Sequence, residues 1–193
     1  MFEVRVHGRR GQGVLTAAEV LAIAASLGGR RAQACPGFGA RRAAGVVVAY
    51  CRLDDAAADM QEPVVRPDAV IVADEALLDR PAVFSGLRED GYLLVNSGRC
   101  ARTLSLPLLA LRPDRVITVP ATELVRKATG GADVASVLLG GFVALTGVVP
   151  VDALLAALRQ WYRGPQGKVN AAVALTTFGI VRTEVEDLTE AVP

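Results

Sequence analysis

Apolar and polar side chains alternate along residues 2–7, and this pattern predicts a β-strand. The segment Gly8–Gly13 interrupts the alternation with three glycines. Residues 14–27 then favour a helix, and the pair Gly28–Gly29 supplies its stop signal. A strand, a glycine-rich loop and a helix in this order are typical of the opening of a parallel α/β unit.

Further strands are predicted by short apolar runs in the first two thirds of the chain. These runs cover residues 32–35, 46–51, 69–73, 92–95 and 116–119. The runs at 46–51, 69–73 and 116–119 are almost entirely apolar, which is typical of strands buried on both faces. A short helix and a turn at Asp90–Gly91 precede the run at 92–95, and residues 56–67 are predicted to form a loop.

The C-terminal third changes to helical patterning. Helices are predicted over residues 121–128, 133–146, 152–163 and 168–180. Asp133 and Asp152 are candidate N-caps for two of them. This third is too apolar to stand alone, so we expect it to pack on the sheet.

Together the elements predict an α/β fold with a mostly parallel sheet flanked by helices and a helix-rich C-terminal third. A length of 193 residues with 52% hydrophobic residues fits a single domain with a sizeable core. We assign the domain to residues 1–183 and treat residues 184–193 as an acidic tail that frays.

The net charge of the chain is only +1, which gives no overall support for nucleic-acid binding. The charge is uneven, however, because residues 1–52 hold eight arginines against two glutamates. An anionic ligand or an acidic partner is therefore expected near the N-terminal quarter. Charged residues make up 21% of the chain, which fits a surface partly covered in a complex.

The three cysteines are Cys35, Cys51 and Cys100, and no two of them form a C-x-x-C pair. This spacing argues against an iron–sulfur cluster or a cysteine-rich zinc site built by this chain alone. An odd number of widely spaced cysteines favours reduced thiols and a cytoplasmic location. We expect no signal peptide and no membrane span, because no sufficiently long apolar stretch is present.

The spacing Gly8-x-x-Gly11-x-Gly13 argues against two known types of nucleotide-binding loop for the first loop. It reverses the G-x-G-x-x-G order of dinucleotide-binding loops, and it lacks the Lys and Ser/Thr of a P-loop. Two interpretations stay open. In one, backbone N–H groups at the helix start bind an anion with help from Arg9 and Arg10. In the other, the loop is a tight turn with solvated arginines.

Other candidate reactive residues do not form a catalytic set. His7 is the only histidine and ends a predicted strand, but no Ser, Cys or paired acid stands at a diagnostic spacing from it. Asp74 and Glu75 fit paired carboxylates or a helix cap, and Cys35 fits a reactive thiol or a small buried residue. We expect the chain alone not to be catalytic.

Several segments of the chain resemble segments of one family, the gamma subunits of 2-oxoacid:ferredoxin oxidoreductases of the pyruvate synthase type. The segments are VHGRRGQGVLTAAEVLA (Val6–Ala22), QACPGFGARR (Gln33–Arg42), PDAVIVAD (Pro67–Asp74), GYLLVNS (Gly91–Ser97), VPATELV (Val119–Val125) and VLLGGFVALTGVVP (Val137–Pro150), with Asn170 at the start of the last helix. The chain departs from the family at Arg10, where glycine is usual, across residues 40–46, and at Asp133, where asparagine is common.

The resemblance implies a subunit of a complex that converts a 2-oxoacid, coenzyme A and an oxidised acceptor into an acyl-CoA, CO₂ and the reduced acceptor. Alpha and beta subunits, with delta as a further candidate, are the implied partners, and ferredoxin or a similar acceptor is reached through the complex. Thiamine diphosphate and iron–sulfur clusters belong to those partners. Coenzyme A is the candidate ligand of this chain, with Gly8, Arg9, Gly11, Gln12 and Gly13 as its binding residues.

Three alternatives stay open beside this interpretation. The chain could belong to an indolepyruvate-type oxidoreductase, which uses a related domain. It could be a non-catalytic assembly module without ligand contact. It could also be a stand-alone nucleotide-binding protein.

Overall fold

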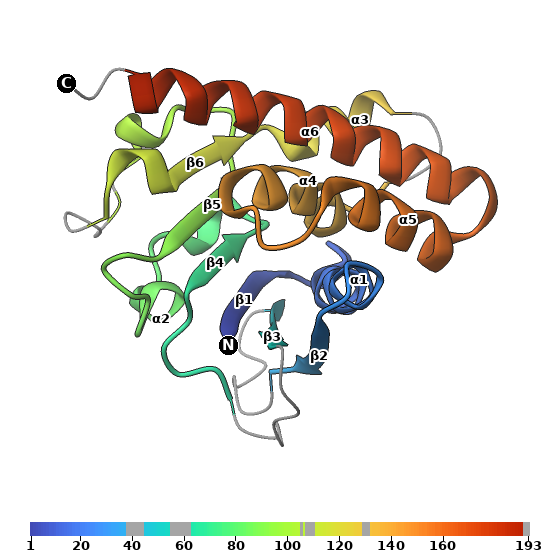
Figure 1. The fold of residues 1–193 in the computed structure, drawn as a ribbon. Helices are drawn as coiled ribbons and strands as arrows, with labels where there is room; N and C mark the ends of the chain where they lie inside the picture. Colours follow the sequence, from blue (N-terminus) through green and yellow to red (C-terminus); the bar gives the residue numbers. More distant parts are fainter. Residues whose placement is uncertain (38–44, 55–62, 105, 107–110, 129–131, 191–193) are drawn as a thin grey trace.

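A computed structural model describes residues 1–37, 45–54, 63–104, 106, 111–128 and 132–190, and it contains a six-stranded sheet with helices packed against it (Figure 1). The strands are β1 (Phe2–Arg9), β2 (Arg31–Pro36), β3 (Val46–Asp54), β4 (Ala69–Val72), β5 (Tyr92–Asn96) and β6 (Val116–Val119). Their order across the sheet is β2-β3-β1-β4-β5-β6. The predicted strands are thus confirmed, with ends shifted by a few residues.

Strand β3 is the one strand of this sheet that runs against the others. It pairs antiparallel with both β1 and β2, whereas β1, β4, β5 and β6 pair in parallel. The mostly parallel sheet is therefore confirmed. Only residues 37–45 join β2 to β3, and a parallel crossover needs a dozen or more residues. The start of β3 is only half-buried, so the expectation of burial on both faces is wrong for Val46–Val48.

The helices lie on both faces of the sheet, and most of them come from the C-terminal third. They are α1 (Val14–Leu27), α2 (Pro81–Phe84), α3 (Ala121–Lys127), α4 (Val134–Thr146), α5 (Val151–Tyr162) and α6 (Gly164–Glu190), with short 3₁₀ turns η2 (Glu75–Leu77), η3 (Ala101–Thr103) and η4 (Pro113–Arg115). The predicted bounds of α1 are confirmed at both ends. No helix in the described part of the chain is long and apolar enough to cross a membrane.

Helix α6 is much longer than the predicted 168–180, and it crosses the molecule as the long red helix in Figure 1. The expected fraying from residue 184 is wrong as far as Glu190. Val181, Val185 and Leu188 recur at helical spacing and pack on the core, so the apolar stripe continues into the acidic segment.

The two predicted N-caps have different outcomes. Asp133 does occupy the N-cap position of α4, but its carboxylate makes no capping bond there. Asp152 is not an N-cap, because α5 starts one residue earlier, after Pro150, and Asp152 lies in its first turn.

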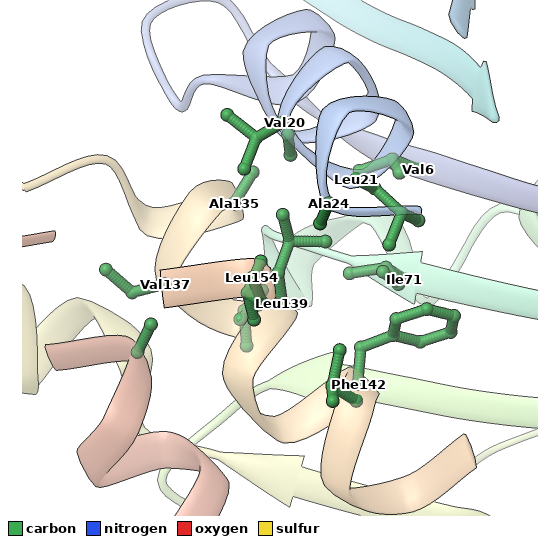
Figure 2. Packing of buried hydrophobic residues seen from close by; sticks show 14 of the residues in the cluster. Val6, Val20, Leu21, Ala24, Ile71, Ala135, Val137, Leu139, Phe142 and Leu154 are labelled. Atoms are coloured by element: carbon green, nitrogen blue, oxygen red, sulfur yellow. The ribbon is translucent and has the colours of Figure 1, made fainter. Parts of the chain in front are cut away.

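The main core lies between the sheet and a layer formed by α1, α4, α5 and α6. Figure 2 shows Leu139 and Phe142 of α4 directed at Val6 and Ile71 of the sheet, with Leu21 of α1 beside them. Ten of the thirteen residues of α4 are buried, as expected for a central helix covered on all sides. The helical third thus packs on the sheet, as its composition predicts.

A smaller cluster covers the other face. Val70, Val72, Leu93 and Val95 from β4 and β5 pack against residues of η2 and α2. Along β1, Arg5 and His7 point to this side, since Val4 and Val6 point to the main core. The Arg5 guanidinium is buried and donates to the carbonyl oxygens of Val83 (3.0 Å) and Ser85 (2.6 Å).

His7 is 5% exposed, and among the described residues its Nε2 atom has no hydrogen-bond partner. Burial, followed by the nearby positive charge of Arg5, lowers the pKa of His7 to about 3. His7 is therefore a neutral, buried residue in the folded chain. This environment favours the structural interpretation of His7 over a catalytic one.

Helices α4 and α6 approach closely at a glycine. A Cβ atom on Gly140 would overlap the carbonyl oxygen of Ala174 and would lie 2.5 Å from Thr177 Oγ1. The Thr177 hydroxyl donates to the carbonyl oxygen of Val137 across the same interface (2.6 Å). Gly179 of α6, in contrast, has open space around its Cβ position.

We expect Gly140→Ala to lower the free energy of unfolding by about 3 kcal/mol, because the extra methyl group must push the two helices apart. The matched variant Gly179→Ala should instead raise it by about 0.5–1 kcal/mol, through helix propensity alone. Urea unfolding followed by circular dichroism measures both. Equal effects of the two variants would show that α4 and α6 are not in close contact.

We also expect His7 to make stability depend on pH. Between about pH 3 and pH 6.5 the unfolded chain binds a proton at His7 that the folded chain does not, so stability falls as the pH drops through this window. From pH 6.5 to pH 5 the loss amounts to about 2 kcal/mol. The variant His7→Gln should lose this part of the slope in urea unfolding series, and an unchanged slope would contradict the buried neutral state.

Candidate functional site

The carboxyl ends of β1, β4, β5 and β6 meet at one edge of the sheet. From β1 the chain passes through α1 to β2 on one side, and it later enters β4 on the other side of β1. Ligands of open α/β sheets bind outside the carboxyl ends of the strands at such a point of reversal. The glycine loop 10–13 follows β1 at this edge, so the topology supports a site there.

A cleft of about 430 Å³ opens at the same edge. Its lining residues follow the strand ends and are Gln12, Ala73, Asp74, Glu75, Asn96, Ser97, Gly98, Pro120, Thr122 and Glu123. Another hollow, of about 460 Å³, is lined by Leu104, Val116 and Leu188 among others. That hollow is not lined by the glycine loop, so we place the candidate site at the strand ends.

The glycines of the loop are required for two different reasons. Gly13 is the N-cap of α1 in the left-handed conformation (φ 73°), and Gly11 also has a positive φ of 86°. Gly8 has an ordinary φ, but a Cβ there would lie 2.6 Å from Val14 Cγ2 and 3.1 Å from Ala73 Cβ. The spacing that the sequence shows is thus explained by backbone geometry and close packing.

Gln12 holds the loop in shape. Its side-chain Oε1 accepts a hydrogen bond from the backbone N–H of Arg9 (2.6 Å). The backbone N–H of Gln12 donates in return to the carbonyl oxygen of Arg9 (3.2 Å). The backbone carbonyl oxygen of Gln12 accepts a hydrogen bond from the N–H of Ala135 at the start of α4 (2.9 Å). The N–H of Arg10 donates to the carbonyl oxygen of Gly45. At most the N–H groups of Gly11, Gly13 and the first turn of α1 are left for an outside anion.

Arg9 reaches across the loop to a carboxylate. Its Nε atom lies 2.8 Å from Asp74 Oδ2, and the two side chains are 44% and 20% exposed. Gln12 Nε2 lies 3.4 Å from the same oxygen. Asp74 Oδ1 accepts the N–H of Ala76 (3.0 Å) and so caps η2, which confirms the cap interpretation of this residue.

A second carboxylate, that of Asp133, lies against Gly13. A Cβ atom on Gly13 would be 2.8 Å from Asp133 Oδ2, which places the carboxylate beside the N-cap residue of α1. The Tyr162 hydroxyl donates to this oxygen (2.5 Å), and the backbone N–H of Asp133 donates to Asn170 Oδ1 (3.1 Å). Burial and the bond to Asp133 raise the pKa of Tyr162 above its ordinary value. The positive end of α1 thus already faces a negative charge of the protein.

Asn96 fixes the floor of the cleft. Its Nδ2 donates to the carbonyl oxygen of Ala73 (2.8 Å) and to Thr122 Oγ1 (2.7 Å). Its Oδ1 accepts the N–H of Thr122 in the first turn of α3 (3.1 Å). One buried side chain therefore ties together the ends of β4, β5 and β6.

The cleft is more acidic than the N-terminal sequence suggests. Asp74, Glu75 and Glu123 line it, with Arg9 and Arg99 at their sides. Hydrogen bonds from Ser97 and then Arg99 lower the pKa of Glu75, so this group is ionised at neutral pH. Arg41 and Arg42, which belong to the predicted basic quarter, lie outside the described residues.

Of the five predicted loop residues, Gln12 lines the cleft and Arg9 contacts its lining residue Asp74, whereas Gly8, Gly11 and Gly13 are not among the lining residues. The structure does not bring His7 there, because that side chain is buried under the opposite face. Sequence reasoning missed Asn96, Thr122 and Asp133 as site residues. Asn96 and Thr122 each follow a predicted strand, which was the available signal, whereas no local pattern connects Asp133 with Gly13.

Within the described residues, no group of three or more His, Cys, Asp or Glu side chains could hold a metal ion. In the cleft the Ser97 hydroxyl hydrogen-bonds Glu75, and the lowered pKa of that carboxyl makes it a weak base. What the arrangement offers is the exposed guanidinium groups of Arg9 and Arg99, a side-chain amide and a few backbone N–H groups above a polar floor.

Comparison with known proteins gives consistent matches over almost the whole chain. The family model described as pyruvate ferredoxin/flavodoxin oxidoreductase matches residues 3–179. Pyruvate synthase subunit PorC of Methanothermobacter thermautotrophicus is 38% identical over 178 residues, which are 92% of this chain and 94% of that protein. The pyruvate/ketoisovalerate oxidoreductases common subunit gamma of Thermococcus litoralis is 36% identical, with coverages of 92% and 96%.

Among solved structures, pyruvate oxidoreductase subunit PORC of Thermotoga maritima aligns with a TM-score of 0.75 at 31% identity. The alignment covers 92% of this chain and 95% of that one. The sheet and the helical layer described above are therefore the fold of that subunit.

Proposed function

The chain belongs to the pyruvate ferredoxin/flavodoxin oxidoreductase family, and we propose that it serves as the gamma subunit of a 2-oxoacid:ferredoxin oxidoreductase complex. The observation that carries this proposal is the match to two named subunits over more than nine tenths of both lengths. The resemblance that the loop and strand motifs indicate in the sequence is thus confirmed.

In such a complex a 2-oxoacid, coenzyme A and an oxidised acceptor become an acyl-CoA, CO₂ and the reduced acceptor. We assign thiamine diphosphate and the iron–sulfur clusters to alpha, beta and, where present, delta subunits. The complex works in the cytoplasm, where a reducing environment suits an odd number of cysteines.

The 2-oxoacid is selected outside this chain. One of the similar proteins is named as a gamma subunit common to pyruvate and ketoisovalerate oxidoreductases. A subunit that two enzymes share cannot distinguish their substrates, so its contribution must lie elsewhere. Assembly and contact with the shared substrate, coenzyme A, are the two candidate contributions.

We propose coenzyme A as the ligand of the loop Gly8–Gly13. Arg9 is 44% exposed at the edge of the cleft, and a guanidinium is well suited to a phosphate group. Asn96 makes its hydrogen bonds within the chain, and Thr122, whose hydroxyl oxygen accepts one of them, makes the nearby floor polar. A pure assembly role is the second candidate, and the observation that favours it is that Asp74 and Asp133 already face the positive groups of the loop.

In the assembled complex, we expect Arg9→Gln to raise the KM for coenzyme A about tenfold, because a charge-assisted contact is lost. The KM for the 2-oxoacid should barely change. Arg182→Gln is the matched control, since it removes the same charge from an exposed position on α6. Equal KM values for coenzyme A in wild type and Arg9→Gln would leave the assembly role as the function of this chain.

We further expect the purified chain to show no 2-oxoacid-dependent dye reduction when thiamine diphosphate and coenzyme A are supplied. Co-expression with the alpha and beta subunits should yield a stable complex in size-exclusion chromatography, because obligate interfaces are large and apolar. Turnover by the chain alone, or its elution as a monomer in the presence of those subunits, would contradict the proposal.

A further inference from the structure

The Arg9–Asp74 ion pair occupies the place where an anion would contact the loop. Arg9 Nε and Gln12 Nε2 both face Asp74 Oδ2, at 2.8 Å and 3.4 Å. A phosphate oxygen that accepted the single hydrogen of Arg9 Nε would have to take the place of that carboxylate oxygen. The position is thus filled by an anion that belongs to the chain itself.

Asp74 cannot easily leave this place. Its other oxygen accepts the N–H of Ala76, and the residue is the N-cap of η2, so its backbone and one carboxylate oxygen are fixed. Of the two side chains in this ion pair, that of Arg9 has more freedom to move, because it is long and 44% exposed. An exchange of partners would therefore move Arg9 and leave Asp74 next to the incoming phosphate.

We infer that Asp74 sets the affinity of the loop for phosphate by competing with the ligand for Arg9. This inference rests on the proposed function, in which coenzyme A contacts the loop. Binding then exchanges one carboxylate contact for one phosphate contact, and the negative charge of Asp74 opposes the second anion. The affinity stays lower than the donors alone would give, which suits a substrate whose acylated product must leave the same loop.

The test measures the equilibrium Kd of coenzyme A for the assembled complex by calorimetry. Asp74→Asn keeps an oxygen for the Ala76 N–H and removes the charge that holds Arg9. Because exposed ion pairs contribute up to about 1 kcal/mol, we expect the Kd to fall about threefold to fivefold. In the Arg9→Gln background the same change should alter the Kd by less than about twofold, because the guanidinium for which Asp74 and the phosphate compete is absent.

Glu75→Gln provides the matched control. It removes a carboxylate from the same cleft, one residue away, but its partner is Arg99 rather than Arg9. Its effect on the Kd should be clearly smaller than that of Asp74→Asn. Equal effects of the two variants, or an undiminished effect of Asp74→Asn in the Arg9→Gln background, would overturn the competition and leave only general electrostatics.

The two proposals fail in different ways. If Arg9→Gln weakens binding and Asp74→Asn does not tighten it, the inference about Asp74 is wrong and the ligand role stands. If Arg9→Gln leaves the Kd unchanged, coenzyme A does not use the loop and both are wrong. Dephospho-coenzyme A, which lacks the 3′-phosphate, identifies the phosphate group that exchanges with Asp74. If Asp74→Asn still lowers the Kd of this ligand, the group is the diphosphate, and if it does not, the group is the 3′-phosphate. Either result supports the exchange.

Discussion

The contact between the first loop and the start of α4 is the constraint on which the site depends. The carbonyl oxygen of Gln12 accepts the N–H of Ala135, and Gly13 leaves room for the Asp133 side chain. Asn170 of α6 in turn accepts the N–H of Asp133. The loop after β1 is thereby held between the sheet and the helical layer. Its shape follows from tertiary packing, and not only from its own glycines.

The same packing decides the electrostatics of the edge. A glycine loop before a helix presents N–H groups with partial positive charge, and such a site attracts anions. Here Asp133 lies beside Gly13 at the start of α1, and Asp74 pairs with Arg9 of the loop, and both aspartates come from distant parts of the sequence. A ligand at this edge therefore meets a site that is already neutralised in large part. Under the ligand role proposed above, binding is an exchange rather than a simple addition of charges.

The family assignment fits this picture of a supporting subunit. The chain has an extensive core, a central helix buried on all sides and a 27-residue helix across the outside. Its cleft offers donors and a polar floor but no catalytic set among the described residues. In the proposed function, such a scaffold positions a shared substrate beside catalytic subunits that carry the reactive groups. The division of labour explains how one gamma subunit can serve two enzymes, as the name of its Thermococcus relative states.

The sequence by itself determined most of the elements and the place of the loop. Strands and helices follow from local periodicity, and for α1 both ends were predicted because Gly13 and Gly28 mark them. The length of α6 could also have been read from Val181, Val185 and Leu188, but the acidic residues between them obscured that stripe. The reversal of β3 follows from a connection too short for a parallel crossover.

Only the tertiary structure decided what the loop residues contact. Arg9 looks like a phosphate ligand in the sequence, and the fold places it on Asp74, which lies sixty-five residues further along the chain. Asp133 looks like a helix cap, and the fold places its carboxylate on Gly13 and Tyr162. Periodicity is local and survives in the sequence. The pairing of charges depends on which strand ends and helix starts meet, and only the folded chain fixes that.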